Sequence, residues 1–318
     1  MDYRIIEGDC IESMRRLEGQ SVNCVVTSPP YFGLRDYGHD GQIGLEASPD
    51  AFVARLVDVF REVRRVLRDD GTLWLNLVDS YAGGGTIGRN DTTLEALARR
   101  AERYGTGTGA GSAVGASGTR KPVADLKPKD LIGIPWRVAF ALQADGWYLR
   151  QDIIWHKPNP MPESVRDRCT KAHEYIFLLS KSERYFFDSE AMKEPSANPE
   201  RAGKLERSFS TGKPDAVLRQ DVGRAVMRTE TRNRRSVWTV PTRPYKGAHF
   251  ATFPPDLIRP CILAGCPKDG TVLDPFGGSG TTALVALEEG RKAVLCELNP
   301  DYIALAHKRL EGLQLRIA

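Results

Sequence analysis

A glycine-rich turn, Asp274-Pro275-Phe276-Gly277-Gly278-Ser279-Gly280-Thr281-Thr282, lies between an apolar run at 271–273 and a second one at 283–287. This order predicts a strand, a turn and a helix. Glycine permits positive φ angles and lets a ligand come close to the main chain, and the first N–H groups of a helix can bind an anion. The turn indicates either a nucleotide-type cofactor site or a tight strand-to-helix connection without a ligand.

A third apolar run, at 292–296, ends in Glu297, about twenty residues after the turn. An acidic side chain at this point of a βαβ unit can accept hydrogen bonds from both hydroxyls of a ribose. We therefore expect Glu297 to bind the ribose of a cofactor. The other residues expected around that cofactor are Asp274, Phe276, Gly277, Gly278, Ser279, Gly280 and Thr281.

The tetrapeptide Ser28-Pro29-Pro30-Tyr31 follows the apolar run at 21–27 and makes a rigid turn at the end of an expected strand. With the glycine-rich turn, it resembles the amino-methylating DNA methyltransferases that use S-adenosylmethionine, in the permuted beta class whose catalytic tetrapeptide precedes the cofactor loop. The resemblance covers most of the chain. The expected strands together give an α/β fold, a doubly wound, mostly parallel Rossmann-like methyltransferase sheet with an inserted target-recognition region.

The resemblance also implies roles for residues outside these two motifs. In the family, an acidic residue after the first strand contacts the adenine amino group of the cofactor, which assigns this role to Asp9 and the backbone of Cys10. Physical chemistry gives Asp9 a second interpretation, as the cap of the following helix. The segment at 249–254 resembles the one that packs against the cofactor's methionine and adenosine, and it contributes His249, Phe250 and Phe253.

The tetrapeptide suits methyl transfer to an exocyclic base amine, whose lone pair is delocalised into the ring. Because the cofactor supplies the methyl group on a sulfonium, the protein has to position the nucleophile. Ser28 Oγ and the Pro29 carbonyl can accept hydrogen bonds from the amine, while Pro30 helps to keep the turn rigid. Tyr31 offers a ring on which a flipped-out base can stack. We expect Ser28 to align the amine with the methyl group and not to remove its proton, since a serine alone is no general base near neutral pH.

Ser28 at the first position resembles the cytosine-N4 enzymes, whereas adenine-N6 enzymes more often carry Asp or Asn there. A hydroxyl can also satisfy a ring nitrogen or carbonyl beside the amine. We therefore predict N4-methylcytosine, with adenine-N6 methylation as the alternative and a non-catalytic DNA-binding module as a further one. A carbon-5 methylase would need a Pro-Cys nucleophile, but Pro260-Cys261 lies in an expected helix.

Positive charge is concentrated in one segment of the chain. The formal net charge is +4, yet residues 200–246 contain twelve Lys and Arg against five Asp and Glu. Such a run is often a solvated surface, but beside a methylation site it suggests contacts with DNA phosphates, for which Arg232, Arg234 and Arg235 are the candidates. We expect a catalytic half at 1–184 with a flexible insertion at 82–121, a target-recognition region at 185–246 and an S-adenosylmethionine-binding half at 247–318.

Composition excludes several other classes of protein. No apolar stretch approaches the roughly 20 residues that span a bilayer, so a soluble, cytoplasmic and nucleoid-associated protein is expected. The six cysteines lack metal-ligand spacing, and we expect no metal. His173 is expected to be structural. The expected partner is double-stranded DNA, with a cognate restriction endonuclease that could act separately; monomer and dimer both remain open.

Overall fold

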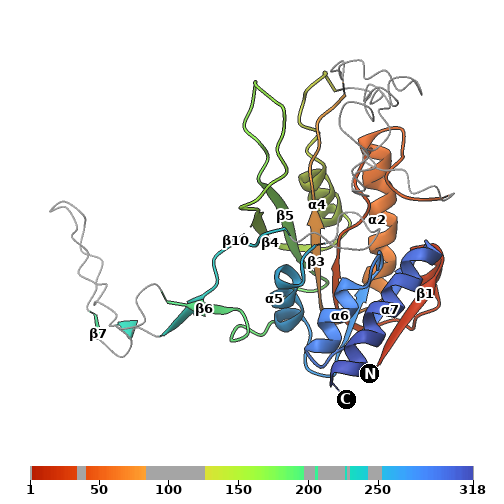
Figure 1. The fold of residues 1–318 in the computed structure, drawn as a ribbon, viewed down its shortest axis with the longest axis vertical. Helices are drawn as coiled ribbons and strands as arrows, with labels where there is room; N and C mark the ends of the chain where they lie inside the picture. The colour runs from red at the N-terminus through yellow and green to blue at the C-terminus, as the bar shows by residue number, and fades with distance from the viewer. Residues whose placement is uncertain are drawn as a thin grey trace, which may run out of the picture.

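One central sheet of eight strands organises the part of the protein that the computed structural model describes (Figure 1), namely residues 2–33, 41–83, 126–196, 205–206, 226–227, 230–242 and 253–317. The strand order is β1-β12-β11-β2-β3-β5-β4-β10. The strands are β1 (Tyr3–Glu7), β2 (Val22–Thr27), β3 (Leu67–Leu77), β4 (Tyr148–His156), β5 (His173–Ser180), β10 (Val237–Thr239), β11 (Thr271–Asp274) and β12 (Lys292–Glu297).

Most neighbouring strands of this sheet are parallel. β1, β12, β11, β2 and β3 form a continuous parallel set, in which Tyr3 is paired with Ala293 and Val25 with Leu273. β5 is antiparallel to both β3 and β4, and β10 is again parallel to β4. The prediction of a mostly parallel α/β sheet is therefore confirmed.

Helices cover both faces of the sheet, as a doubly wound fold requires. One face packs against α1 (Cys10–Arg15), α2 (Pro49–Val66) and α4 (Ile134–Ala144), and the other against α5 (Pro255–Gly265), α6 (Thr281–Glu288) and α7 (Pro300–Ile317). Side chains of the strands alternate between the two cores: Val25 and Leu73 belong to the first, whereas Val26 and Trp74 belong to the second. Burial on both faces explains why these strands read as continuous apolar runs.

The local sequence explains both the start and the buried face of α2. Ser48 accepts a hydrogen bond from the Ala51 N–H (3.1 Å), and Pro49 occupies the first turn, so the helix begins with a capped end. Its buried residues recur at helical spacing and face the sheet: Phe52, Leu56, Val59, Phe60 and Val63. The helix passes at Leu67 directly into β3.

Helix α4 begins at Ile134, where a side chain from another part of the chain binds its first N–H groups. The carboxylate of Asp79 accepts hydrogen bonds from the N–H groups of Gly133 (2.9 and 3.1 Å) and Ile134 (3.1 Å). Gly133 has a φ of 79°, which allows the chain to turn into the helix there. A side chain distant in sequence therefore caps this helix, which local patterns do not reveal.

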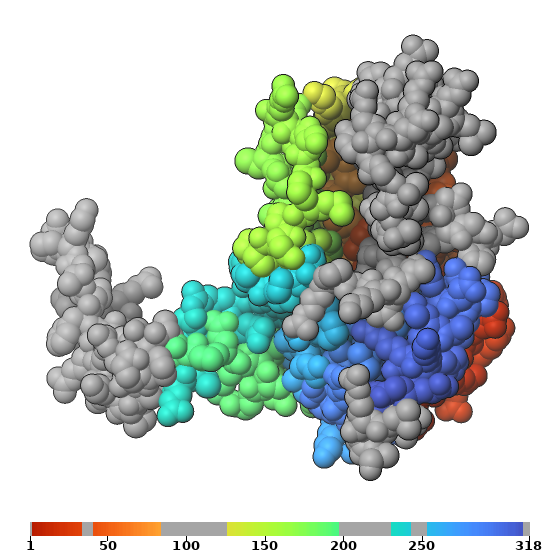
Figure 2. All heavy atoms as spheres, in the orientation of Figure 1, coloured from red at the N-terminus to blue at the C-terminus, as the bar shows by residue number. Residues whose placement is uncertain are grey.

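A second structural unit extends from the main body on the side of α5. It contains the antiparallel pair β6 (Lys193–Pro195) and β9 (Thr231–Asn233), and the short pair β7 (Leu205–Glu206) and β8 (Val226–Met227). Figure 2 shows the green and cyan residues of this unit projecting beyond the main body. β10 follows β9 and joins the central sheet by pairing with β4. The predicted insertion at 82–121 lies almost wholly outside the described residues.

Within the described ranges, no helix combines the length and the apolar character needed to cross a membrane.

Candidate active site

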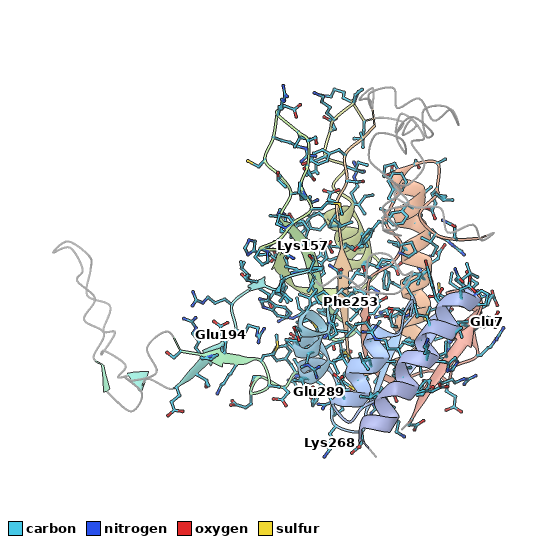
Figure 3. The ribbon with its side chains drawn as sticks, in the orientation of Figure 1. Glu7, Lys157, Glu194, Phe253, Lys268 and Glu289 are labelled. Carbon is cyan, nitrogen blue, oxygen red and sulfur yellow. The ribbon has the colours of Figure 1, made fainter. Side chains whose placement is uncertain are left out.

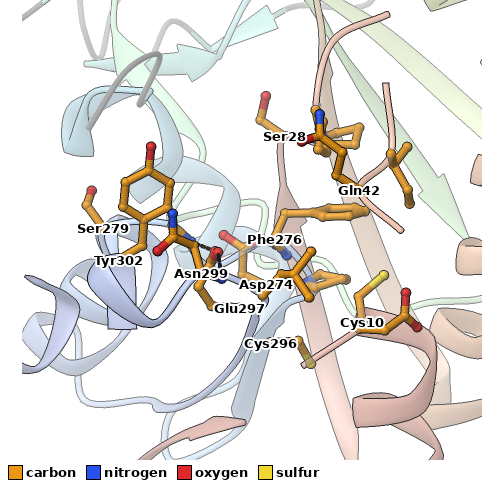
Figure 4. Close-up of a pocket in the computed structure, with 18 of the residues that line it drawn as sticks. Cys10, Ser28, Gln42, Asp274, Phe276, Ser279, Cys296, Glu297, Asn299 and Tyr302 are labelled. Carbon is orange, nitrogen blue, oxygen red and sulfur yellow. Dashed lines mark hydrogen bonds between the residues drawn. The ribbon is translucent and has the colours of Figure 1, made fainter. Parts of the chain in front are cut away.

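One pocket lies where the parallel strands β1, β2, β11 and β12 end, and it brings together the two motifs from opposite ends of the chain (Figure 4). Ser28, Pro29, Pro30 and Tyr31 line it from the loop after β2. The glycine-rich turn lines it from the loop after β11, through Asp274 to Ser279 and Thr281. Asp9, Cys10, Phe253 and Glu297 complete the predicted residues found there.

Asp274 holds the glycine-rich loop from within. Its carboxylate accepts hydrogen bonds from Thr27 Oγ1 (2.6 Å), Thr282 Oγ1 (2.6 Å) and the Phe276 N–H (3.0 Å). Only 2% of the residue is exposed, and this burial raises its pKa to about 7 against the lowering effect of those three hydrogen bonds. The carboxylate thus ties β2, the loop and α6 together, immediately beside Ser28.

The glycines at 277 and 280 serve close packing around the loop. A Cβ on Gly277 would lie 2.8 Å from Leu295 Cβ, and a Cβ on Gly280 would lie 3.0 Å from Ala306 Cβ. Gly280 also has a φ of 77°, in the left-handed region that favours glycine. Arg309 reaches the same loop from α7, donating to Thr281 Oγ1 (2.8 Å) and to the Ser279 carbonyl (3.2 Å).

Glu297 connects the loop after β12 to the glycine-rich loop. Its Oε2 accepts a hydrogen bond from the Gly278 N–H (2.7 Å) and its Oε1 from the Asn299 N–H (2.9 Å) (Figure 4). These contacts fix the orientation of the carboxylate at the pocket wall. A carboxylate can accept about four hydrogen bonds, so the two backbone contacts are compatible with the predicted ribose contact.

Asp9 caps α1 and also lines the pocket. Its Oδ1 accepts from the N–H groups of Ile11 (2.9 Å) and Glu12 (3.1 Å), and its Oδ2 lies 3.4 Å from the Arg55 guanidinium. Cys10 beside it is buried, and burial, reinforced by the charge of Asp9, raises the pKa of its thiol to about 12. Cys10 is therefore an uncharged part of the wall at neutral pH.

The tetrapeptide is held by its own side chains and by a residue that the sequence did not single out. Ser28 Oγ donates to Tyr31 Oη (3.3 Å), and Tyr31 Oη donates to Glu174 Oε2 (3.4 Å). Glu174 also accepts from Asn76 Nδ2 (3.0 Å) and forms an ion pair with Lys157. The sequence offered one signal for Glu174, because it is an acidic residue directly before the apolar run at 175–179. Such a residue is rarely buried without a partner.

Other pocket residues also escaped the sequence analysis. Gln42 and Ile43 lie between α2 and the tetrapeptide in sequence, and Asn299 and Tyr302 surround the start of α7. They belong to loops and a helix end without a recognisable motif, so only the folded chain brings them to the pocket.

The arginines predicted to bind DNA lie outside the pocket, on β9 and the segment before β10. Arg232 and Arg235 both form ion pairs with Glu194, at 2.9 and 3.3 Å, and the Arg234 guanidinium lies 5.2 Å from the centre of the Trp238 ring. They are thus neighbours on one ribbon. His249 and Phe250 lie outside the described residues, whereas Phe253 is buried in the pocket wall.

The remaining chemistry of the described residues agrees with the rejection of a cysteine nucleophile. Pro260 and Cys261 lie inside α5, and burial raises the pKa of the Cys261 thiol.

His173 pairs with His156 across β4 and β5, and burial lowers the pKa of His173. The described ranges contain no cluster of His, Cys, Asp or Glu suited to a metal ion.

The side chains of the pocket fit a nucleoside-type cofactor. Glu297 supplies a carboxylate for hydroxyl groups, the loop supplies polar backbone, and Phe276 and Phe253 supply aromatic surface. The protein can therefore hold S-adenosylmethionine in the pocket that also contains Ser28.

Comparisons with known proteins identify the family. A family model described as DNA methylase, of the N6/N4 type, matches residues 22–308. The Type II methyltransferase M.Cfr9I of Citrobacter freundii is 49% identical over 97% of this chain and 87% of its own length. The Type II methyltransferase M.SmaI of Serratia marcescens is 48% identical over 96% of this chain and 90% of its own length.

Solved structures share the fold. The PvuII DNA methyltransferase (cytosine-N4-specific) has a TM-score of 0.62 at 18% identity, covering 96% of this chain and 86% of that one. TTHA0409 from Thermus thermophilus, complexed with S-adenosyl-L-methionine, has a TM-score of 0.56 at 22% identity, covering 97% and 94%. The chain therefore belongs to the N6/N4 DNA methylase family and is a DNA methyltransferase that takes its methyl group from S-adenosylmethionine.

Proposed function

We propose that the protein methylates the N4 amine of cytosine at a specific sequence in double-stranded DNA. The observation that carries this proposal is the presence of Ser28 Oγ in the same pocket as the cofactor loop. Ser28 stands at the first position of the tetrapeptide, where it resembles the cytosine-N4 enzymes, and its neutral hydroxyl can accept hydrogen bonds from the amine.

The tetrapeptide contributes alignment to the reaction. Bound S-adenosylmethionine supplies an electrophilic methyl group on its sulfonium. Ser28 Oγ and the Pro29 carbonyl accept hydrogen bonds from the target amine and so direct its lone pair, while the buried Pro29 ring keeps the turn rigid. The two motifs stay in register because Thr27, directly before Ser28, is bonded to Asp274 at the start of the cofactor loop.

Tyr31 captures the flipped-out base in this proposal. Base flipping costs a few kcal/mol, and stacking on an aromatic ring returns about 1–3 kcal/mol per base. The Tyr31 hydroxyl is bonded at Ser28 and Glu174, which fixes the ring beside the acceptor group.

Residues 185–246 are proposed to recognise the DNA sequence. The ribbon of β6 and β9 projects beyond the main body (Figure 2). Arg232 lies on β9, and Arg234 and Arg235 follow directly after it. Relatives at 48–49% identity are Type II methyltransferases, which supports a cytoplasmic, nucleoid-associated enzyme of a restriction-modification system with a separate endonuclease. Residues 1–184 and 247–318 then supply the catalytic and cofactor-binding halves.

Mass spectrometry of digested product DNA tests the target base. The purified enzyme is incubated with unmethylated genomic DNA and S-adenosylmethionine, and the modified nucleosides are identified. N4-methylcytosine is expected; N6-methyladenine as the dominant product would replace the cytosine assignment with the adenine alternative. Ser28→Ala should lose most methyl transfer while it keeps its affinity for S-adenosylmethionine, and Ser21→Ala, outside the pocket, is the matched control.

A further inference from the structure

The hydroxyls of the tetrapeptide belong to a hydrogen-bond chain that ends on a carboxylate. Ser28 Oγ lies 3.3 Å from Tyr31 Oη, which lies 3.4 Å from Glu174 Oε2. An ionised carboxylate only accepts hydrogen bonds. Tyr31 must therefore donate its proton to Glu174, and the Tyr31 oxygen can then accept the proton of Ser28. The carboxylate thus sets one direction of hydrogen-bond donation, from Ser28 to Tyr31 and from Tyr31 to Glu174.

This direction has a consequence for the target amine. A serine hydroxyl has one proton and two lone pairs. With its proton directed to Tyr31, Ser28 presents only lone pairs to the pocket, which is the arrangement that an amine N–H requires. A serine rotated the other way would direct its own proton at the amine and would compete for the lone pair that attacks the methyl group.

Glu174 is held as an acceptor by two partners, one on β3 and one at the end of β4. The residue is 5% exposed, and its Oε1 forms an ion pair with Lys157 at the end of β4. Asn76 on β3 uses its amide group to donate both to Glu174 Oε2 (3.0 Å) and to the Tyr175 carbonyl (3.1 Å), which fixes the amide. Lys157 is itself placed over the Trp155 ring, 4.4 Å from its centre. Asn76 and Lys157 both donate to the Glu174 carboxylate, which therefore acts as an acceptor toward its neighbours.

We propose that Glu174 and Lys157 are positioning residues for methyl transfer, acting through Tyr31 to orient the hydroxyl of Ser28. This inference rests on the proposed function, in which Ser28 accepts from the target amine. Neither residue is among those that line the pocket with the glycine-rich loop and Glu297. Loss of the pair should therefore reduce the chemical step and leave cofactor binding intact.

A double-mutant cycle on Tyr31 and Glu174 tests the proposal. Glu174→Gln keeps the shape but adds an N–H donor that can reverse the chain, and Tyr31→Phe keeps the aromatic ring but removes the link. Each single variant should lower the single-turnover rate of methyl transfer by about 10- to 100-fold. Because both act through one chain, the double variant should be no slower than the slower single variant.

Two further measurements separate positioning from a general structural effect. Calorimetry should show that Glu174→Gln binds S-adenosylmethionine with the wild-type affinity. The fluorescence of 2-aminopurine at the target base should show that this variant flips the base as the wild type does. Glu289→Gln is the matched control, because Glu289 also pairs with a cation, Arg259, but lies outside the pocket and well away from Lys157 (Figure 3). This control should keep the wild-type rate.

The outcomes are distinguishable from those of the proposed function. A wild-type enzyme that makes no N4-methylcytosine in the same assay contradicts the function. A wild-type enzyme that makes it, with Glu174→Gln or Tyr31→Phe at the full rate, overturns the positioning role. Multiplicative losses in the double variant also overturn it. If Glu174→Gln does not fold, Lys157→Gln and Tyr31→Phe give the same decision.

Discussion

Asp274 and Glu297 end neighbouring parallel strands, yet their carboxylates have different surroundings. Asp274 is buried and bonded to two threonine hydroxyls, whereas Glu297 is half-buried and bonded to two backbone N–H groups at the pocket. The sequence predicts both as cofactor residues because each is an acid at a strand end. It does not predict their difference, because Thr27, a partner of Asp274, lies near the opposite end of the chain.

Glu297→Ala should weaken binding of S-adenosylmethionine by about 1–3 kcal/mol, the range for a hydrogen-bonding site left without its partner. The truncation also removes the acceptor of the Gly278 N–H, which lies in the cofactor loop. Calorimetry measures the affinity, with Glu7→Ala as control, since Glu7 pairs with Glu297 across β1 and β12 but is exposed and outside the pocket. Equal affinities for Glu297→Ala and wild type would remove the ribose assignment.

Asp274 should make stability depend on pH. Burial raises its pKa from 3.8 to about 7, so the folded state binds this proton more tightly than the unfolded state. The stabilisation is present below about pH 4 and is lost as the pH rises towards 7. Asp274→Asn mimics the protonated group and does not lose this stabilisation. The free energy of unfolding of the variant, relative to that of the wild type, should therefore increase as the pH rises, by at most about 1.4 kcal/mol per pH unit. Urea unfolding at several pH values measures this gain; a difference independent of pH would contradict it.

At the scale of elements, the sequence predicts most helices and strands but not the contacts that set their limits. β2, β11, α6 and β12 appear where the apolar runs at 21–27, 271–273, 283–287 and 292–296 place them. The start of α4 is set by Asp79, from the loop after β3, which caps it. β10 was not predicted as part of the sheet, because a strand of three residues has too short a pattern to read and depends on its pairing with β4. The sequence predicted the pocket's two motifs, whereas Glu174 became visible only through its partners.

The junction between the glycine loop and α6 should tolerate no side chain at Gly280. Gly280→Ala places a Cβ 3.0 Å from Ala306 Cβ at a φ of 77°, and it should destabilise the protein by about 1–3 kcal/mol. Gly312→Ala is the matched control, because Gly312 lies within α7 with nothing within 4 Å, and it should stabilise by about 0.5–1 kcal/mol. Thermal unfolding compares the two; equal effects would show that the left-handed turn is not required.

At the scale of the whole molecule, the net charge of +4 says less than its distribution. The arginines of the β9 ribbon are partly neutralised by Glu194, which pairs with both Arg232 and Arg235. The sequence could predict the basic segment but not this pairing, since Glu194 comes to β9 only through the β6 strand. The ribbon therefore presents less free positive charge than its composition indicates.

DNA affinity should depend on salt through this ribbon. Replacing Arg232, Arg234 and Arg235 together with Gln should lower the slope of log affinity against log salt by about 0.9 for each phosphate that is no longer neutralised. Glu194→Gln should strengthen DNA binding because it frees Arg232 and Arg235. Fluorescence anisotropy at several salt concentrations measures both, and Arg259→Gln, on α5, is the control. A triple variant with the wild-type slope would make the arginines an ordinary solvated surface.

The parallel pairing of β1 with β12 has a consequence for how the protein is made. Tyr3 is paired with Ala293, so β1 has no partner on that edge until the segment around residue 293 has been synthesised. At about 5–20 residues per second, the ribosome needs roughly 15–60 s to reach β12. Throughout that time the edge of β1 is open to pairing with other nascent chains. The pocket, which needs both β1 and β12, can form only after β12 has been synthesised.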